Sequence, residues 1–221
     1  MMSSLIGSAP SRKDVRGMHL SRGRRSATVT LYWLPLGAGG RSVRWNGRLF
    51  ESLTAWHEHR VPCTLYHSAL EVRIGPARYV IEMAPVWAEP GDHGVVKVGP
   101  VAVAWLGRSA LFRYEVRRWR DGVIPDIEEA AGSPQCVGRS LVRAQRLLDL
   151  VPQVPALTWG RDDLGAGDMW NSNSLVSWLL TRSGHDVHAV RPPALGRAPG
   201  WKAGLVLAAS QTTDESLRSR L

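Results

Sequence analysis

Hydrophobic positions over the first half of the chain follow the pattern of β-strands. Five stretches are rich in β-branched and aromatic residues, several of them with alternating polar positions. Gly75-Pro76 separates the second stretch from the third and is a typical hairpin signal. The predicted strands are residues 28–36, 64–74, 77–86, 95–105 and 109–118.

Helical spacing of apolar residues appears in three other stretches, which are residues 48–60, 137–151 and 171–182. The third is expected to end at Gly184, a residue type that favours the end of a helix. The apolar run 202–209 is expected to form a last short strand. This order predicts an α+β fold, with an antiparallel sheet packed by helices gathered on one side.

Composition divides the chain into a tail, one domain and a second tail. Residues 1–27 contain six of the basic residues and a single acid, Asp14, in a chain of net charge +9. We expect a disordered basic tail over 1–27, a single domain over 28–210 and a flexible C-terminal tail over 211–221. The first tail is either a solvated segment, or it results from an assigned start that lies upstream of the true initiating methionine, Met18. As a third alternative, it makes weak, non-specific contact with nucleic acid or another acidic surface.

The remaining composition excludes several classes of protein. No apolar run approaches the roughly 20 residues that a membrane-spanning helix needs. Two cysteines are too few for a disulfide scaffold, and the N-terminus has no apolar segment of the kind found in secretory signals. We therefore expect a cytoplasmic protein without a membrane span, and we expect no metal and no cofactor.

One pair of segments has a chemical argument behind it. Ser172 lies at the predicted start of the helix 171–182, where free backbone N–H groups and the helix dipole favour a developing negative charge. His67 lies in the predicted strand 64–74 and has the chemistry of a general base. A nucleophile and a base on neighbouring elements predict acyl-transfer chemistry.

The same two segments resemble a known family. His67-Ser68-Ala69-Leu70-Glu71-Val72 resembles the histidine strand of PPPDE-type peptidases, and Asn171-Ser172-Asn173-Ser174 resembles their Asn-Cys-Asn-Thr/Ser helix start. The order, histidine first and nucleophile second, is that of circularly permuted papain-like folds. These include the lecithin:retinol acyltransferase-like and permuted NlpC/P60 groups. The resemblance covers roughly residues 28–185.

The resemblance implies a hydrolase or acyltransferase that acts on an amide, thioester or ester, with His67 as base and Ser172 in the nucleophile position. Asn171 and Asn173 match the flanking asparagines and are expected to shape the site or its oxyanion hole. Glu82, on the next strand, is the candidate for the third, orienting residue.

Serine in the cysteine position leaves three readings open, because a hydroxyl is far harder to ionise than a thiol. The chain is a working serine enzyme, or a catalytically inactive papain-like module that binds a peptide or acyl ligand, or a protein in which Ser172 only caps a helix. Cys136 is a weaker candidate nucleophile, since it also precedes a predicted helix.

Three further residues are candidates for binding the substrate. Arg161 and Arg197 would hold an anionic group, and Trp170 would supply an aromatic wall. The alternative is structural: the arginines pair with nearby aspartates, and Trp170 packs the helix onto the sheet.

Overall fold

The computed structural model describes residues 26–36, 63–86, 93–102 and 112–219. The predicted helix 48–60 and nearly all of the predicted basic tail lie outside these residues. Within them the fold is α+β, as the sequence predicts, and the strands form one sheet in the order β4-β5-β3-β2-β1-β6. The strands are β1 (Ala27–Pro35), β2 (Thr64–Ile74), β3 (Ala77–Pro85), β4 (Val95–Pro100), β5 (Arg113–Arg120), β6 (Gln135–Gly138) and β7 (Gly196–Arg197).

The register of the central strands gives the sheet two distinct faces. Neighbours along this order pair antiparallel, and Leu70 of β2 lies between Leu31 of β1 and Ile81 of β3. Because side chains alternate along a strand, every second residue from these positions belongs to the same face. That face carries the main core, and its buried strand residues include Val29, Leu31, Trp33, Leu70, Val72 and Ile81. The other face has a smaller core around Leu34, Ala69, Val80 and Ile124.

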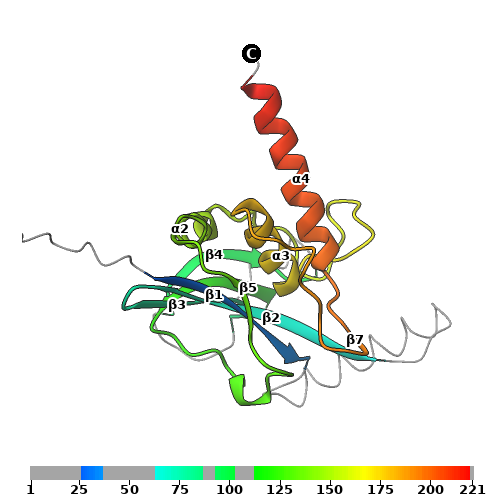
Figure 1. Cartoon of the computed structure of the whole chain (residues 1–221). Helices are drawn as coiled ribbons and strands as arrows, with labels where there is room; N and C mark the ends of the chain where they lie inside the picture. Colours follow the sequence, from blue (N-terminus) through cyan, green and yellow to red (C-terminus); the bar gives the residue numbers. More distant parts are fainter. Residues whose placement is uncertain (1–25, 37–62, 87–92, 103–111, 220–221) are drawn as a thin grey trace, which may run out of the picture.

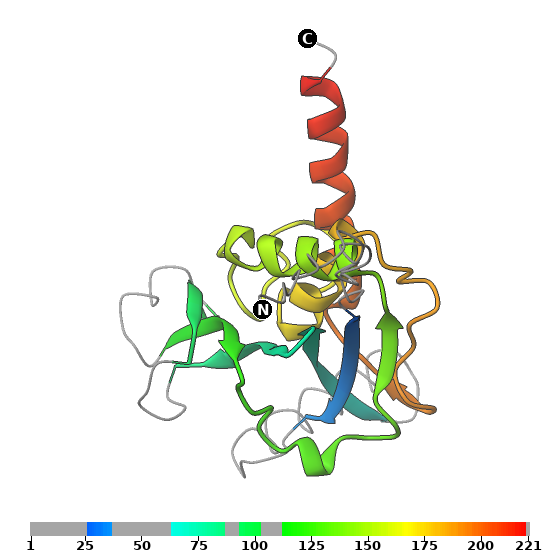
Figure 2. The ribbon, with the colours of Figure 1, turned by 60° about the vertical axis from the view of Figure 1, so that its left-hand side comes forward.

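The helices cover the face with the main core. They are α2 (Leu141–Leu150), α3 (Ser172–Arg182) and α4 (Trp201–Arg218). Two short 3-10 helices complete the fold: η3 (Ile127–Glu129) lies between β5 and β6, and η4 (Val151–Gln153) follows α2 directly. Figure 1 shows α2 and α3 lying over the sheet, whereas η3 lies on the opposite side in Figures 1 and 2. Helix α3 is almost entirely buried, which fits its position between the sheet and α4.

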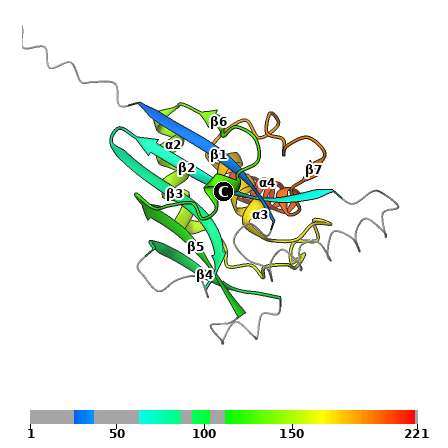
Figure 3. The ribbon, with the colours of Figure 1, turned by 90° about the horizontal axis from the view of Figure 1, so that it is seen from below.

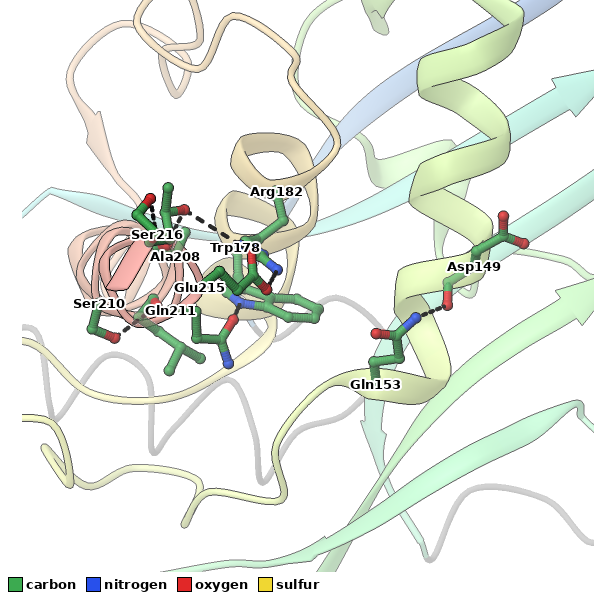
Figure 4. A network of polar contacts seen from close by, with 11 residues as sticks. Asp149, Gln153, Trp178, Arg182, Ala208, Ser210, Gln211, Glu215 and Ser216 are labelled. Atoms are coloured by element: carbon green, nitrogen blue, oxygen red, sulfur yellow. Dashed lines mark hydrogen bonds and ion pairs between the residues drawn. The ribbon is translucent and has the colours of Figure 1, made fainter. Parts of the chain in front are cut away.

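Helix α4 occupies residues that the sequence analysis assigned to a strand and to the C-terminal tail. The apolar run 202–209 is helical, so the predicted last strand is wrong. The same helix includes residues 211–218 of the predicted C-terminal tail. The outer half of α4 projects away from the body (Figures 1 and 2). It is fastened to α3 by a hydrogen bond from Trp178 Nε1 to Gln211 Oε1 (2.8 Å) and by an ion pair between Arg182 and Glu215 (Figure 4).

The candidate site lies at a gap in the strand pairing of β2. Strand β3 pairs with β2 only from Leu70 to Ile74, and β7 pairs only with Thr64 and Leu65. Residues 66–69 therefore have β1 on one side and no described strand on the other. The start of α3 reaches this edge, because Asn173 Nδ2 donates a hydrogen bond to Tyr66 O (2.8 Å). Figure 3 shows β7 and the beginning of β2 beside α3 and α4.

Candidate functional site

The start of α3 is capped in a way that leaves one backbone N–H free. Asn171 Oδ1 accepts hydrogen bonds from the N–H groups of Asn173 (2.9 Å) and Ser174 (3.3 Å), while Ser174 Oγ accepts from the N–H of Asn171 (3.0 Å). This is a reciprocal capping box. Ser172 is the first residue of the helix, and its N–H has no hydrogen-bond partner in the described structure. An unpaired N–H at a helix start suits an oxyanion.

The side chains of both asparagines help to hold this start in place. Asn171 Nδ2 and Asn173 Nδ2 both donate to Pro199 O, at 2.9 and 2.7 Å. The Asp168 carboxylate then accepts from the N–H groups of Gly200 and Lys202 and so caps α4, whose own N-cap residue is a glycine. These contacts fit a site-shaping role for Asn171 and Asn173. Asn173 Nδ2 uses both of its hydrogens, on Pro199 O and Tyr66 O, whereas Asn171 Nδ2 donates only one in the described structure.

His67 and Ser172, 105 positions apart in the sequence, line the same cavity of about 270 Å³. Its walls are mostly apolar and come from the start of β2, the loop before α3 and the segment before α4. The described lining residues are Leu36, Leu65, His67, Trp159, Gly160, Met169, Asn171, Ser172, Asn173 and Pro199. The pairing of the two predicted residues in one cavity is the central feature of the site.

His67 is held in this cavity as a neutral ring. Its backbone lies opposite Leu34 of β1, which puts it on the sheet face away from the helices, beside the gap that α3 fills. The residue keeps some exposure to the cavity, but the surrounding protein desolvates the ring and lowers the pKa of His67 to about 4, so the imidazole is uncharged at neutral pH. In the described structure neither the His67 ring nor the Ser172 hydroxyl has a hydrogen-bond partner. The two groups share a cavity without being bonded to each other.

The lowered pKa of His67 predicts a dependence of stability on pH. The unfolded chain takes up a proton at the ordinary histidine pKa of about 6.5, before the folded chain does. The stability that the neutral His67 contributes is therefore complete above pH 6.5. It is lost as the pH falls towards 4, and this lowers the free energy of unfolding by at most about 3 kcal/mol. Urea unfolding of the wild type and of His67→Gln at pH 7.5 and 4.5 measures this difference.

The variant is expected to lose less free energy of unfolding than the wild type on going to pH 4.5. Part of the loss will persist, because burial and Arg143 also lower the pKa of His185. An equal loss in both proteins would contradict the burial of a neutral ring at position 67.

No hydrogen bond or ion pair joins Glu82 to His67 in the described structure. Strand β3 leaves β2 after Ile81 and continues along β5, where Glu82 lies opposite Arg117. Its carboxylate accepts a hydrogen bond from Arg117 Nη1 (3.1 Å), and both side chains are buried. Burial raises the pKa of Glu82, and the neighbouring Arg117 opposes that rise. The orienting role predicted for Glu82 remains a prediction that no contact supports.

The three predicted substrate-binding residues are absent from the described lining of the cavity. Arg161 is largely exposed and forms an ion pair with Asp163 (3.6 Å), as its structural alternative predicts. Trp170 is buried in the main core, and Arg197 is exposed on β7. Cys136 is exposed on β6 and is not among the cavity residues.

The apolar walls were not predicted as site residues. Trp159, Gly160 and Met169 lie in the loop before α3, and Pro199 lies before α4, in stretches whose sequence carries no periodic pattern. The nearest signal is the Trp-Gly dipeptide at 159–160, which stands out in composition but indicates no role.

Comparison with known proteins identifies no relative: no family model, no curated protein and no solved structure matches this chain. In the part of the chain that the structure describes, no helix has both the length and the apolar character needed to cross a membrane.

Proposed function

We propose that this protein is a hydrolase- or acyltransferase-like enzyme of papain-like type, with Ser172 as nucleophile and His67 as base. The observation that carries the proposal is the shared cavity. It places a hydroxyl at a capped helix start, an unpaired backbone N–H and a neutral imidazole around one space. These are the parts that acyl transfer needs: a nucleophile, a base and an oxyanion donor.

The reaction proceeds in two halves. Ser172 Oγ attacks the acyl carbonyl and passes its proton to the His67 ring, while the N–H of Ser172 stabilises the oxyanion. The bond to the leaving group then breaks, and the leaving group takes the proton from His67. Water, or the hydroxyl, thiol or amine of an acceptor, attacks the acyl-serine. His67 takes the proton of that nucleophile and returns it to Ser172.

The cavity and its base both restrict the substrate. A volume of about 270 Å³ is at the small end for ligand pockets, and its apolar walls suit a short, uncharged acyl group. A histidine with a pKa of about 4 is a weak base, and no carboxylate of the described residues contacts its ring. An ester or thioester is therefore favoured over an amide, because its leaving group departs with less help from a proton.

The proposal predicts hydrolysis of short-chain p-nitrophenyl esters that requires both residues. His67→Ala is expected to lower the rate by at least about 100-fold, the usual contribution of a positioned base, and Ser172→Ala, which removes the nucleophile, by at least as much. The acyl chain is varied from acetyl to decanoyl, with a preference expected for the shorter chains. Ser177→Ala is the matched control, because it removes a buried hydroxyl five residues further along α3. Hydrolysis that survives Ser172→Ala would contradict the proposal.

A second candidate is a non-catalytic module that binds a peptide or an acyl group in the same cavity. It is favoured by two observations: the described structure shows no hydrogen bond between His67 and Ser172, and no carboxylate that bonds to the imidazole. This candidate predicts that a short-chain ester raises the melting temperature of the wild type and of Ser172→Ala equally. It also predicts hydrolysis no faster than in buffer.

A further inference from the structure

We propose that Ser68 is a positioning residue of this site, which acts through Asn173 to fix the placement of His67 relative to Ser172. This inference rests on the proposed function, because it concerns the geometry of the same pair. Ser68 was not among the residues that the sequence pointed to as carrying the chemistry.

One side chain holds the strand on both sides of His67. Asn173 Nδ2 donates to Tyr66 O, and Asn173 Oδ1 accepts from Ser68 Oγ, each at 2.8 Å. Residues 66 and 68 flank His67 directly, and Asn173 directly follows Ser172. The two hydrogen bonds therefore join the neighbours of the base to the neighbour of the nucleophile.

The two hydrogen bonds that join Asn173 to β2 lie at a part of the strand that has a described neighbour on one side only. This part of β2 has neither β3 nor β7 beside it, so among the described residues no ladder of backbone hydrogen bonds holds this side of residues 66–69. Ser68 and Asn173 are each only 1% exposed, so water cannot replace the hydroxyl. The sheet register puts Ser68 on the helix-facing side of β2 and His67 on the other side. Ser68 therefore acts through Asn173 and not by contact with a substrate.

The direct test is an NMR titration of the His67 ring in a matched pair of variants. Ser68→Val and Ser68→Thr have nearly the same shape, but only threonine keeps the hydroxyl. In Ser68→Val we expect the pKa of His67 to move by at least about one unit towards its ordinary value, because the ring is no longer held in place. In Ser68→Thr it should stay at the wild-type value. Ser68→Ala also removes the hydroxyl but adds no volume, so it should shift the pKa of His67 in the same direction as Ser68→Val.

Ser177→Ala separates positioning from a general loss of stability. Ser177 Oγ is also buried in α3 and donates to Trp201 O (2.8 Å), away from the cavity. Its removal should lower the melting temperature comparably and leave the His67 titration unchanged. An unchanged pKa of His67 in Ser68→Val and Ser68→Ala, or an equal shift in Ser177→Ala, would overturn the inference.

A second readout distinguishes this inference from the proposed function. In a Ser172→Cys background, adding Ser68→Val is expected to slow alkylation of the new thiol by iodoacetamide near pH 6 by about tenfold or more. A thiol at position 172 that is already inert, together with a His67 titration that responds to Ser68→Val, would count against the proposed function. It would leave the positioning role intact.

Discussion

Replacing Arg117 by methionine is expected to lower the free energy of unfolding by about 3–5 kcal/mol, because it leaves the buried carboxylate of Glu82 without its partner. Arg117 also binds Glu115 through Nε and Nη2, at 3.1 and 3.0 Å, so its loss leaves two carboxylates close together on adjacent strands. Urea unfolding at pH 7.5 measures the change.

The double variant Glu82→Leu with Arg117→Met is the control for this prediction. It replaces the buried charges by apolar side chains of similar size, and most of the lost stability should return. A loss below about 1 kcal/mol in Arg117→Met would show that the pair is not buried as described. Glu82→Gln should lower the free energy of unfolding. It should lower esterase activity only to the extent that the protein unfolds. A folded Glu82→Gln protein that has lost activity would instead support the orienting role.

Replacing Ser172 by cysteine is expected to create a thiol that reacts with iodoacetamide below the pH at which an ordinary thiol does. A free cysteine has a pKa near 8.5, and thiols at helix starts fall to about 7.5 or lower. At pH 6 the new thiol should therefore react at least about tenfold faster than an ordinary surface thiol. The exposed Cys136 of the same chain provides the reference in the same sample, and peptide mass spectrometry reads both positions.

His67→Ala in the Ser172→Cys background shows what the imidazole adds to the helix start. We expect the reactivity at pH 6 to fall but not to vanish, because the dipole and free N–H of α3 remain. A thiol at position 172 no faster than Cys136 would favour the non-catalytic module.

The strands around the site could be predicted closely, because short-range signals fix them. Gly75-Pro76 lies at the turn between β2 and β3, and Gly75 has a positive φ of 56° there. The boundaries of β2 match the prediction, and those of β1 and β3 differ by one residue at one or both ends. Helix α3 begins at Ser172, one residue after its predicted start, and its cap is Asn171 instead of Ser172. Several of these ends lie beside a proline, a glycine or a capping side chain that is visible in the sequence, such as Pro35, Gly75 and Asn171.

The remaining elements depend on partners that are distant in the sequence. Residues 137 and 138 belong to β6, which pairs with β1, so α2 begins only after its cap Ser140 and not at 137. Strands β6 and β7 are too short to show a period. The run 202–209 is apolar in a way that fits strand and helix alike, but its buried residues Ala203, Gly204, Leu207 and Ala208 follow helical spacing.

The sequence pointed to the two residues at the centre of the cavity, but not to the residues that surround them. His67 and Ser172 carry recognisable chemistry, and they line one cavity. Glu82 was assigned by extending the pairing of β2 with β3 towards position 67, but that pairing ends at Leu70. The role of Ser68 depends on a gap in the sheet that no local pattern records.

The central claim is that this cavity activates the Ser172 hydroxyl, and a fluorophosphonate probe tests it most directly. Intact-protein and peptide mass spectrometry of the wild-type chain should show one adduct, on Ser172, and His67→Ala should not form it. An unlabelled Ser172 in the folded wild type, or labelling that persists without His67, would contradict the account.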